Sequence, residues 1–219
     1  YNHGFGGAIY SMGSKISNSV FVLNTAIGSG EGGAIFAKSN TQISDCNFID
    51  NKAEYNGNSI GSNGVCLVSN STFHSSNNSG YGLISNYVSG SITLNNSNIY
   101  SDENYIFYNR NSNAIDLKNN YWGESISNLI DDKIFDFYDQ SSLGVVSYTP
   151  ILMTPDTTAP ISPPSNVTKS VSGSDVVLNW SANGESDIAG YKLYYGTPTG
   201  YSYITTVDLG NVTTYTVSG

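Results

Sequence analysis

The chain has 219 residues, of which 38% are hydrophobic and 11% are charged, and its formal net charge is −9. It is too apolar and too aromatic for a disordered chain, and no apolar run reaches the roughly 18 residues of a membrane span. With only eight Lys and Arg residues it has no basic stripe, which excludes nucleic acids and anionic membrane surfaces as partners.

A repeat begins at the first residues, so we expect the sequence to be part of a longer protein. Each of five copies ends on an aromatic or apolar anchor, 23 to 27 residues after the previous one: Phe21, Phe48, Phe73, Ile99 and Trp122. Five places before each anchor stands an apolar residue, which we expect to point inward and to stack: Ile16, Ile43, Val68, Leu94 and Leu117. This period indicates a solenoid.

Two further columns of the repeat predict corners. Three places before each anchor stands Asn or Asp, which we interpret as a structural ladder: Asn18, Asp45, Asn70, Asn96 and Asn119. Asn tolerates a left-handed backbone, and its amide can bond to the neighbouring turn. The Gly-Gly-Ala-Ile copies at 6–9 and 32–35 mark another corner, because glycine adopts positive φ and allows close backbone approach.

The stretch 28–33 also fits the glycine pattern of dinucleotide-binding turns. That pattern requires a helix after it, whereas residues 34–48 alternate like strands, so we interpret these glycines as a corner. Short β-prone runs broken by Gly and Asn predict three small strands per turn rather than helical or leucine-rich repeats. At about 4.8 Å per turn, five turns give a rod of roughly 24 Å.

Gly-Gly-Ala-Ile followed by Phe-x-x-Asn, as at 32–35 and 48–51, resembles the repeat of polymorphic outer-membrane proteins. More broadly, residues 1 to 150 resemble the right-handed parallel β-helices of the pectin-lyase-like superfamily. Asn-Asn-Tyr-Trp-Gly at 119–123 resembles the segment that closes many secreted bacterial β-helices. The resemblance implies an all-β, right-handed parallel β-helix in an extracellular or cell-surface bacterial protein, associated with the outer membrane.

The segment after the fifth copy reads as a cap. Ile126, Ile130, Ile134 and Phe137 fall at helical spacing, with Ser125 or Ser127 as the N-cap. The last turn of a solenoid is an open edge that must be covered. We therefore expect a short helix or folded loop over 122–140 to cover it, followed by an extended strand that ends near residue 152.

The rest of the chain predicts a second module. Residues 153–164 are rich in Pro and Thr and read as a stiff linker. Residues 165–219, with Trp180 and Tyr191 in alternating strands, resemble a fibronectin type III domain, which implies an Ig-like β-sandwich. Such sandwiches need about 100 residues, so we expect an incomplete one. The predicted domains are therefore a β-helix at 1–152, the linker, and the partial sandwich.

We expect no cofactor and no metal site. His3 and His74 have no ligand partners at suitable spacing, and a structural zinc site needs four. We interpret the acids at 131, 132, 136 and 139 as an exposed helix face. Cys46 and Cys66 occupy different columns of neighbouring turns, so we expect them to stay unpaired.

The resemblance suggests two functions. We favour a non-enzymatic adhesin or scaffold whose partner is an extracellular glycan or a cell-surface protein. The alternative is a polysaccharide lyase or hydrolase with its catalytic residues outside this sequence, since no family motif surrounds the only arginine. Tyr105, Tyr108 and Arg110 are candidate glycan contacts, because tyrosines can stack on sugar rings, although aromatics also pack strands.

Overall fold

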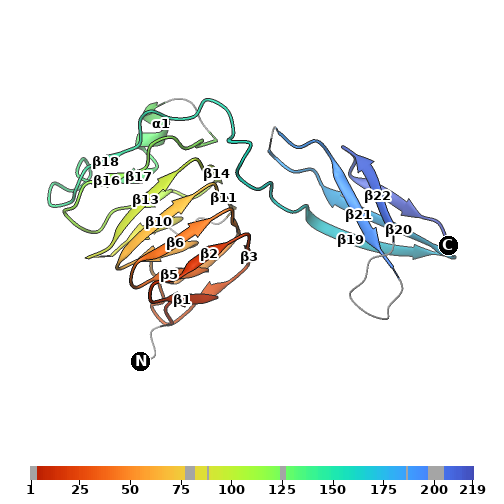
Figure 1. Cartoon of the computed structure of the whole chain (residues 1–219), viewed down its shortest axis with the longest axis horizontal. Helices are drawn as coiled ribbons and strands as arrows, with labels where there is room; N and C mark the ends of the chain where they lie inside the picture. The colour runs from red at the N-terminus through yellow and green to blue at the C-terminus, as the bar shows by residue number, and fades with distance from the viewer. Residues whose placement is uncertain (1–3, 77–81, 88, 124–126, 186, 197–204) are drawn as a thin grey trace. The chain divides into compact units, whose positions relative to one another are not determined.

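The computed structural model describes residues 4–76, 82–87, 89–123, 127–185, 187–196 and 205–219. The chain divides into two compact units, Tyr1–Pro160 and Ile161–Gly219. The first is a parallel β-solenoid, as the repeat predicts, and the second is built from antiparallel sheets (Figure 1). The boundary between them falls inside the predicted linker.

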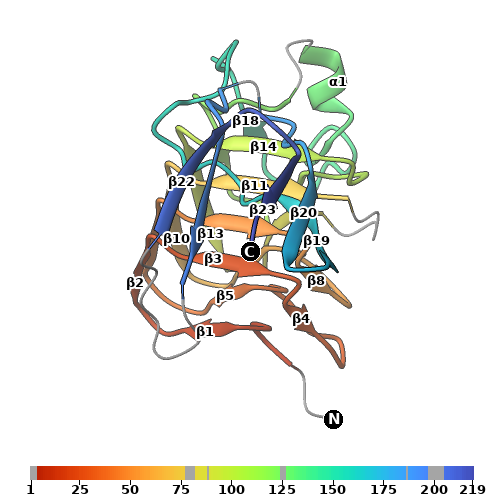
Figure 2. The same cartoon turned by 90° about the vertical axis from the view of Figure 1, so that its right-hand side faces the viewer.

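Three sheets of parallel strands form the solenoid. Sheet 1 runs in the order β1 (Ile9–Ser11), β5 (Ile35–Ala37), β9 (Ile60–Ser62), β12 (Ile84–Asn86), β15 (Phe107–Tyr108) and β17 (Ile134–Phe135). Sheet 2 consists of β2 (Lys15–Ser17), β6 (Thr41–Ser44), β10 (Val65–Ser69), β13 (Ser91–Asn95), β16 (Ile115–Asp116) and β18 (Val146–Ser147). Sheet 3 consists of β3 (Val20–Val22), β7 (Asn47–Ile49), β11 (Thr72–Ser75) and β14 (Asn98–Ser101). Figure 2 shows β3, β11 and β14 as rungs of this last sheet. A small pair, β4 (Thr25–Ala26) and β8 (Lys52–Ala53), lies between sheets 3 and 1 in chain order.

The apolar columns of the repeat form the core. Ile16, Ile43, Val68 and Leu94 pair in register along sheet 2, and Leu117 follows the next strand; all five are buried. The anchors stack beside them, with ring centroids 5.0 Å apart for Phe21 and Phe48 and 4.7 Å apart for Phe48 and Phe73. Each turn therefore places like side chains on like, which holds the register.

The Asn/Asp column turns the corner between sheets 2 and 3 with its backbone. All five residues have φ between 46° and 58°. Their amides donate to carbonyls of the next turn, as from Asn70 to Asn95 at 3.3 Å. The next column adds side-chain hydrogen bonds at the same corner, where the Ser71 amide donates to Ser97 Oγ at 3.1 Å. The smaller hydroxyl, one residue later, faces the neighbouring backbone.

The Phe-x-x-Asn motif forms a second ladder, after sheet 3. Asn51 Nδ2 donates to the Phe21 carbonyl at 2.9 Å, and Asn24 Nδ2 donates to Asn51 Oδ1 at 2.9 Å. The glycine corner follows it: Gly32 has φ 68°, and a Cβ at Gly33 would lie 2.1 Å from the Asn58 carbonyl oxygen. The glycines at 32 and 33 thus serve a corner of the solenoid.

The cap contains a short helix within 122–140, but this helix is shorter than the spacing of the isoleucines indicates. Helix α1 spans only Ser127–Asp131, and Ser125 and Ile126 lie outside the described residues. Ile130 and Ile134 are buried as expected, but Ile134 belongs to β17, which pairs with β15, and Phe137 is 42% exposed. Pairing with an open strand edge thus prevails over helical spacing.

The acids of the cap do not share one exposed helix face. The Asp136 side chain is buried, and its carboxylate accepts hydrogen bonds from the amides of Tyr138 at 2.9 Å and Val146 at 2.7 Å. Asp139 in turn accepts from the Asp136 amide at 3.0 Å. The Asp136 carboxylate ties the cap to β18, because a buried carboxylate needs donors.

Part of the predicted linker packs on the solenoid. The Asn98 side chain makes two hydrogen bonds with the backbone of Asp156. Asn98 Nδ2 donates to the Asp156 carbonyl at 3.0 Å, and Asn98 Oδ1 accepts from the Asp156 amide at 2.7 Å. The Leu152 amide donates to the Asn120 carbonyl at 2.9 Å, and Ala159 is buried. We call residues 152–159 the strap, because they cover the outer face of sheet 3 at Asn98.

The second unit has two antiparallel sheets. One contains β19 (Ser165–Ser172), β20 (Asp175–Ser181) and β23 (Thr214–Val217), and the other β21 (Tyr191–Tyr195) and β22 (Thr205–Gly210). Trp180 and Tyr191 meet edge-on at 5.3 Å. The Tyr191 hydroxyl donates to Asn183 Oδ1 at 3.1 Å. The two sequence-predicted aromatics therefore join the two sheets.

Candidate functional site

The outer face of sheet 1 carries a column of aromatic and small residues. The pairing register aligns Tyr10, Phe36, Gly61, Ser85, Tyr108 and Phe135 from the first strand to the last. Successive side chains of a strand point to opposite faces, and the residues one place earlier form the core. The column is aromatic at both ends and small in the middle.

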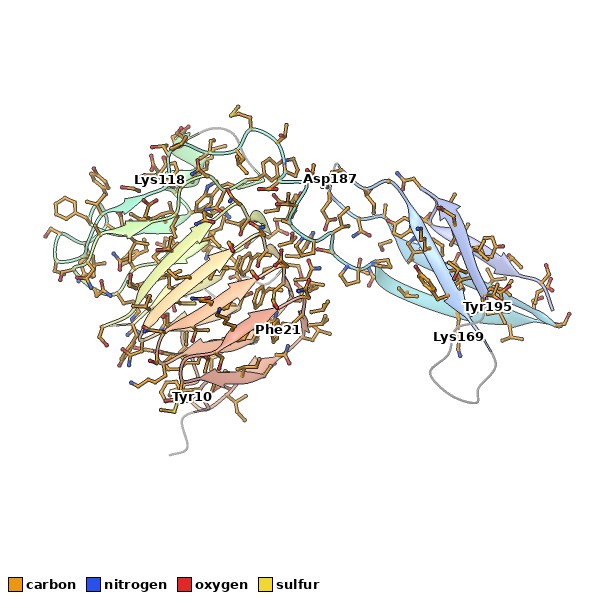
Figure 3. All side chains as sticks on the ribbon, in the orientation of Figure 1. Tyr10, Phe21, Lys118, Lys169, Asp187 and Tyr195 are labelled. Carbon is orange, nitrogen blue, oxygen red and sulfur yellow. The ribbon has the colours of Figure 1, made fainter. Side chains whose placement is uncertain are left out.

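An open hollow of about 550 Å³ lies on this face, towards the N-terminal end of the solenoid. Five aromatic side chains wall it: Phe5, Tyr10, Phe36, Tyr55 and Tyr87. The Phe36 ring lies 4.6 Å from Phe5 and 5.7 Å from Tyr10, and Figure 3 marks Tyr10 at this end. Such a volume is in the range of small-molecule sites.

Polar groups complete the hollow. Ser29, Glu31, Lys38 and Asn63 line it together with the rings. The loop that carries Glu31 can approach the sheet because residue 61 is glycine: a Cβ there would lie 2.9 Å from the Gly32 amide nitrogen. A missing side chain in β9 therefore brings a carboxylate onto the outer face.

Arg110 joins the far walls of the hollow. Its Nη1 lies 3.1 Å from Glu31 Oε1, and its Nη2 donates to the Tyr55 hydroxyl at 3.3 Å. The guanidinium carbon lies 4.9 Å from the Tyr55 ring centroid and 4.8 Å from that of Tyr87. With its amide turned to satisfy both of its atoms, Asn56 also accepts from Nη1 at 2.7 Å. The ion pair with Glu31 and the rings of Tyr55 and Tyr87 together hold the Arg110 guanidinium.

The three candidate glycan contacts separate into two groups. Arg110 contacts two walls of the hollow, whereas Tyr108 stacks on Phe135 at 4.3 Å, with Tyr105 edge-on to both at 5.5 Å. This second group lies at the C-terminal end of sheet 1. The sequence spacing of Tyr105, Tyr108 and Arg110 could not predict this division. Arg110 lies after strand β15, and its side chain contacts residues of the preceding turns.

Sequence reasoning missed Glu31, Phe36, Tyr55 and Tyr87. A signal was present in the repeat, because Lys38, Asn63, Tyr87 and Arg110 each stand three places after the inward residue of their sheet 1 strand. Extending the alignment to this column would have grouped Tyr87 with Arg110, together with Lys38 and Asn63 of the same hollow. Glu31 carries no such signal, since its loop folds back.

Burial governs the charge of several groups. Desolvation raises the pKa of Glu31, and the neighbouring Arg110 charge and hydrogen bonds from Asn56 and Arg110 oppose that rise. Desolvation likewise raises the pKa of the Cys66 thiol to about 12, and Cys46 and Cys66 are both free and buried. Neither thiol is a nucleophile at neutral pH, because the reactive form is the thiolate.

Within the described part of the chain, no cluster of three or more His, Cys, Asp and Glu side chains could hold a metal ion. His74 stacks on Tyr100 at 5.6 Å, and His3 lies outside the described residues. Over the same residues, no helix has the length and apolar character to cross a bilayer. Comparison of the chain with protein-family models, with curated proteins and with solved structures gave no match.

Proposed function

We propose that this chain is a carbohydrate-binding repeat protein, presented outside the cell or at its surface as an adhesin or scaffold. The observation that supports it best is the hollow of about 550 Å³ walled by five aromatic side chains. A pyranose ring has an apolar face of C–H groups and an edge of hydroxyls. Aromatic walls suit the face, and Asn63 and Ser29 suit the edge.

The rigid platform supports the same proposal. Phe36 projects from β5, and its neighbours above and below in sheet 1 are fixed by the parallel register. Tyr10 and Phe36 are the lining residues that stand on strands, and the others lie on the segments between strands. Strands hold side chains more accurately than loops, so these two rings form the fixed part of the hollow. Binding to such a face costs little conformational ordering, because the rings already pack on each other.

A binding screen with matched tyrosine variants tests the proposal. Affinity electrophoresis through gels that contain soluble polysaccharides should show retardation of the unaltered chain. Tyr10→Ala and Tyr87→Ala should each lose most of the retardation, with affinity lowered up to about tenfold, because a stacked ring contributes about 0.5–1.5 kcal/mol. Tyr138→Ala is the control, since Tyr138 is 83% exposed and lies in the cap. Equal retardation of all four proteins would contradict the proposal.

The same polysaccharides distinguish the enzymatic alternative. A binding protein returns the polymer intact, whereas a lyase or hydrolase releases new chain ends. Incubation followed by a reducing-end assay and by absorbance of unsaturated products therefore separates the two. Release of either product by the unaltered chain would favour the polysaccharide-cleaving function.

A further inference from the structure

The Arg110 guanidinium is engaged by the protein on its edge and over its flat surface. Glu31 accepts from Nη1 at 3.1 Å, and the Tyr55 hydroxyl accepts from Nη2 at 3.3 Å. The rings of Tyr55 and Tyr87 lie within 5 Å of the guanidinium carbon. Only 21% of the Arg110 side chain is exposed. An arginine whose hydrogen-bond donors and ring-facing surface are engaged in this way has little exposed surface with which to bind a ligand.

The partners of Arg110 come from distant parts of the chain. Glu31 precedes β5, Tyr55 precedes β9, Tyr87 follows β12 and Arg110 follows β15, so the cluster joins four successive rungs of sheet 1. All three partners line the hollow: Tyr55 and Tyr87 with their rings, and Glu31 with its carboxylate. A planar cation between rings fixes their orientation through cation–π attraction and a directed hydrogen bond.

The charges around the hollow favour an uncharged ligand. Glu31 and Arg110 neutralise each other inside the wall, and their side chains are 5% and 21% exposed. Arg110 lies behind the lining rather than in it, so Lys38 is the cation among the described residues that line the hollow. Lys38 is exposed to solvent, where salt screens its charge within about 10 Å. A chain with a net charge of −9 also repels polyanions at long range.

We infer that Arg110 is a positioning residue that holds the rings of Tyr55 and Tyr87, and that the hollow takes an uncharged sugar ring. The inference rests on the proposed function, because it names the ligand class of the same hollow. Glu31 then acts through Arg110, and the tyrosine rings make the contact. Loss of either charge should disorder the walls.

Calorimetry with two oligosaccharides of equal length tests both parts. The probes are cellohexaose, which is uncharged, and hexagalacturonate, which carries a carboxylate on each ring. The unaltered chain should bind cellohexaose more tightly, with an affinity that is the same at low and high salt. Glu31→Gln and Arg110→Met should each weaken that binding about tenfold, and the double variant should be no weaker than either.

Lys118→Met is the matched control. It removes one cation from another ion pair of the same length, in which Lys118 lies 3.1 Å from Asp116 at the end of β16 and both side chains are exposed. Figure 3 shows Lys118 far from Tyr10 along the solenoid. Near-ultraviolet circular dichroism reports the tyrosine rings without any ligand. Its signal should change in Glu31→Gln and Arg110→Met and stay unchanged in Lys118→Met, while far-ultraviolet spectra show that all three fold.

The outcomes separate the inference from the proposed function. Tighter binding of hexagalacturonate, lost at high salt and in Arg110→Met, would make Arg110 a direct contact and overturn the inference alone. Undiminished cellohexaose binding or an unchanged tyrosine signal in Glu31→Gln and Arg110→Met would overturn the positioning role. Absence of binding to every polysaccharide by the unaltered chain would overturn the proposed function, and the ligand class with it.

Discussion

At the scale of the residue, Glu31 shows how a binding face can oppose stability. Its carboxylate is almost fully enclosed, and burial raises its pKa above the ordinary range for glutamate despite the neighbouring Arg110. A raised pKa in the folded state means that the unfolded chain releases this proton more readily. Ionised Glu31 therefore lowers the free energy of unfolding even as it holds Arg110.

This reasoning predicts a pH-dependent difference between the protein and Glu31→Gln. The stabilising contribution of protonated Glu31 is full below its unfolded pKa and is lost as pH rises through its higher folded pKa. The variant should therefore gain stability relative to the unaltered chain as pH rises across that window. Urea denaturation of both proteins at a series of pH values measures the difference. A constant difference across the series would show that Glu31 titrates as an ordinary exposed glutamate.

A second residue-scale prediction concerns the corner at Asn70. Its φ is 46°, and its amide donates to the Asn95 carbonyl at 3.3 Å. Alanine there should cost about 1–2 kcal/mol of unfolding free energy, because a Cβ without a polar side chain is strained in this region. Asn70→Gly should be nearly neutral, since glycine adopts positive φ freely. Chemical denaturation compares the two, and equal losses would mean that the Asn side chain itself stabilises the turn.

At the scale of the element, the sequence predicts the residues that recur in every turn of the solenoid, and it does not predict contacts that occur only once. The inward column and the anchors repeat every turn, so their spacing alone places them in the core. Ile134 sits at helical spacing yet joins a strand, because the open edge of β15 offers it backbone partners. The Glu31–Arg110 pair joins residues 79 apart, which no local pattern shows.

The strap carries the element-scale prediction. Asn98→Ala removes both hydrogen bonds to Asp156 and leaves its amide and carbonyl without these partners. The strap should therefore open more often, and limited proteolysis within 152–159 should be faster in this variant. Asn95→Ala, in the neighbouring sheet 2 strand, is the control. Equal cleavage rates would show that other contacts hold the strap.

At the scale of the whole molecule, the two units differ in how they are stabilised. The solenoid buries a continuous column from Ile16 to Val146, whereas among the described residues of the second unit Tyr191 is the buried hydrophobic side chain. A hollow of about 300 Å³ lies against Leu178, Trp180 and Leu193 in that unit. The β19–β20–β23 sheet and the β21–β22 pair thus enclose little apolar surface.

We predict that residues 1–160 unfold cooperatively when made alone, and that residues 161–219 do not. The first piece keeps its stacked core and its strap, while the second buries too little surface to offset its chain entropy. Far-ultraviolet circular dichroism melts of the two pieces decide it. A sharp transition in the shorter piece would show that its two sheets suffice as a core.

The reach of Arg110 back to Glu31 also constrains how such a gene can change. Each turn of a solenoid contacts only its neighbours, so the stacked core would tolerate the gain or loss of a whole repeat. Glu31 and Arg110 are separated by a fixed number of rungs, from β5 to β15. Copies added outside that interval leave the pair intact, whereas a copy gained or lost inside it parts the two charges. The hollow thereby fixes the repeat number between them.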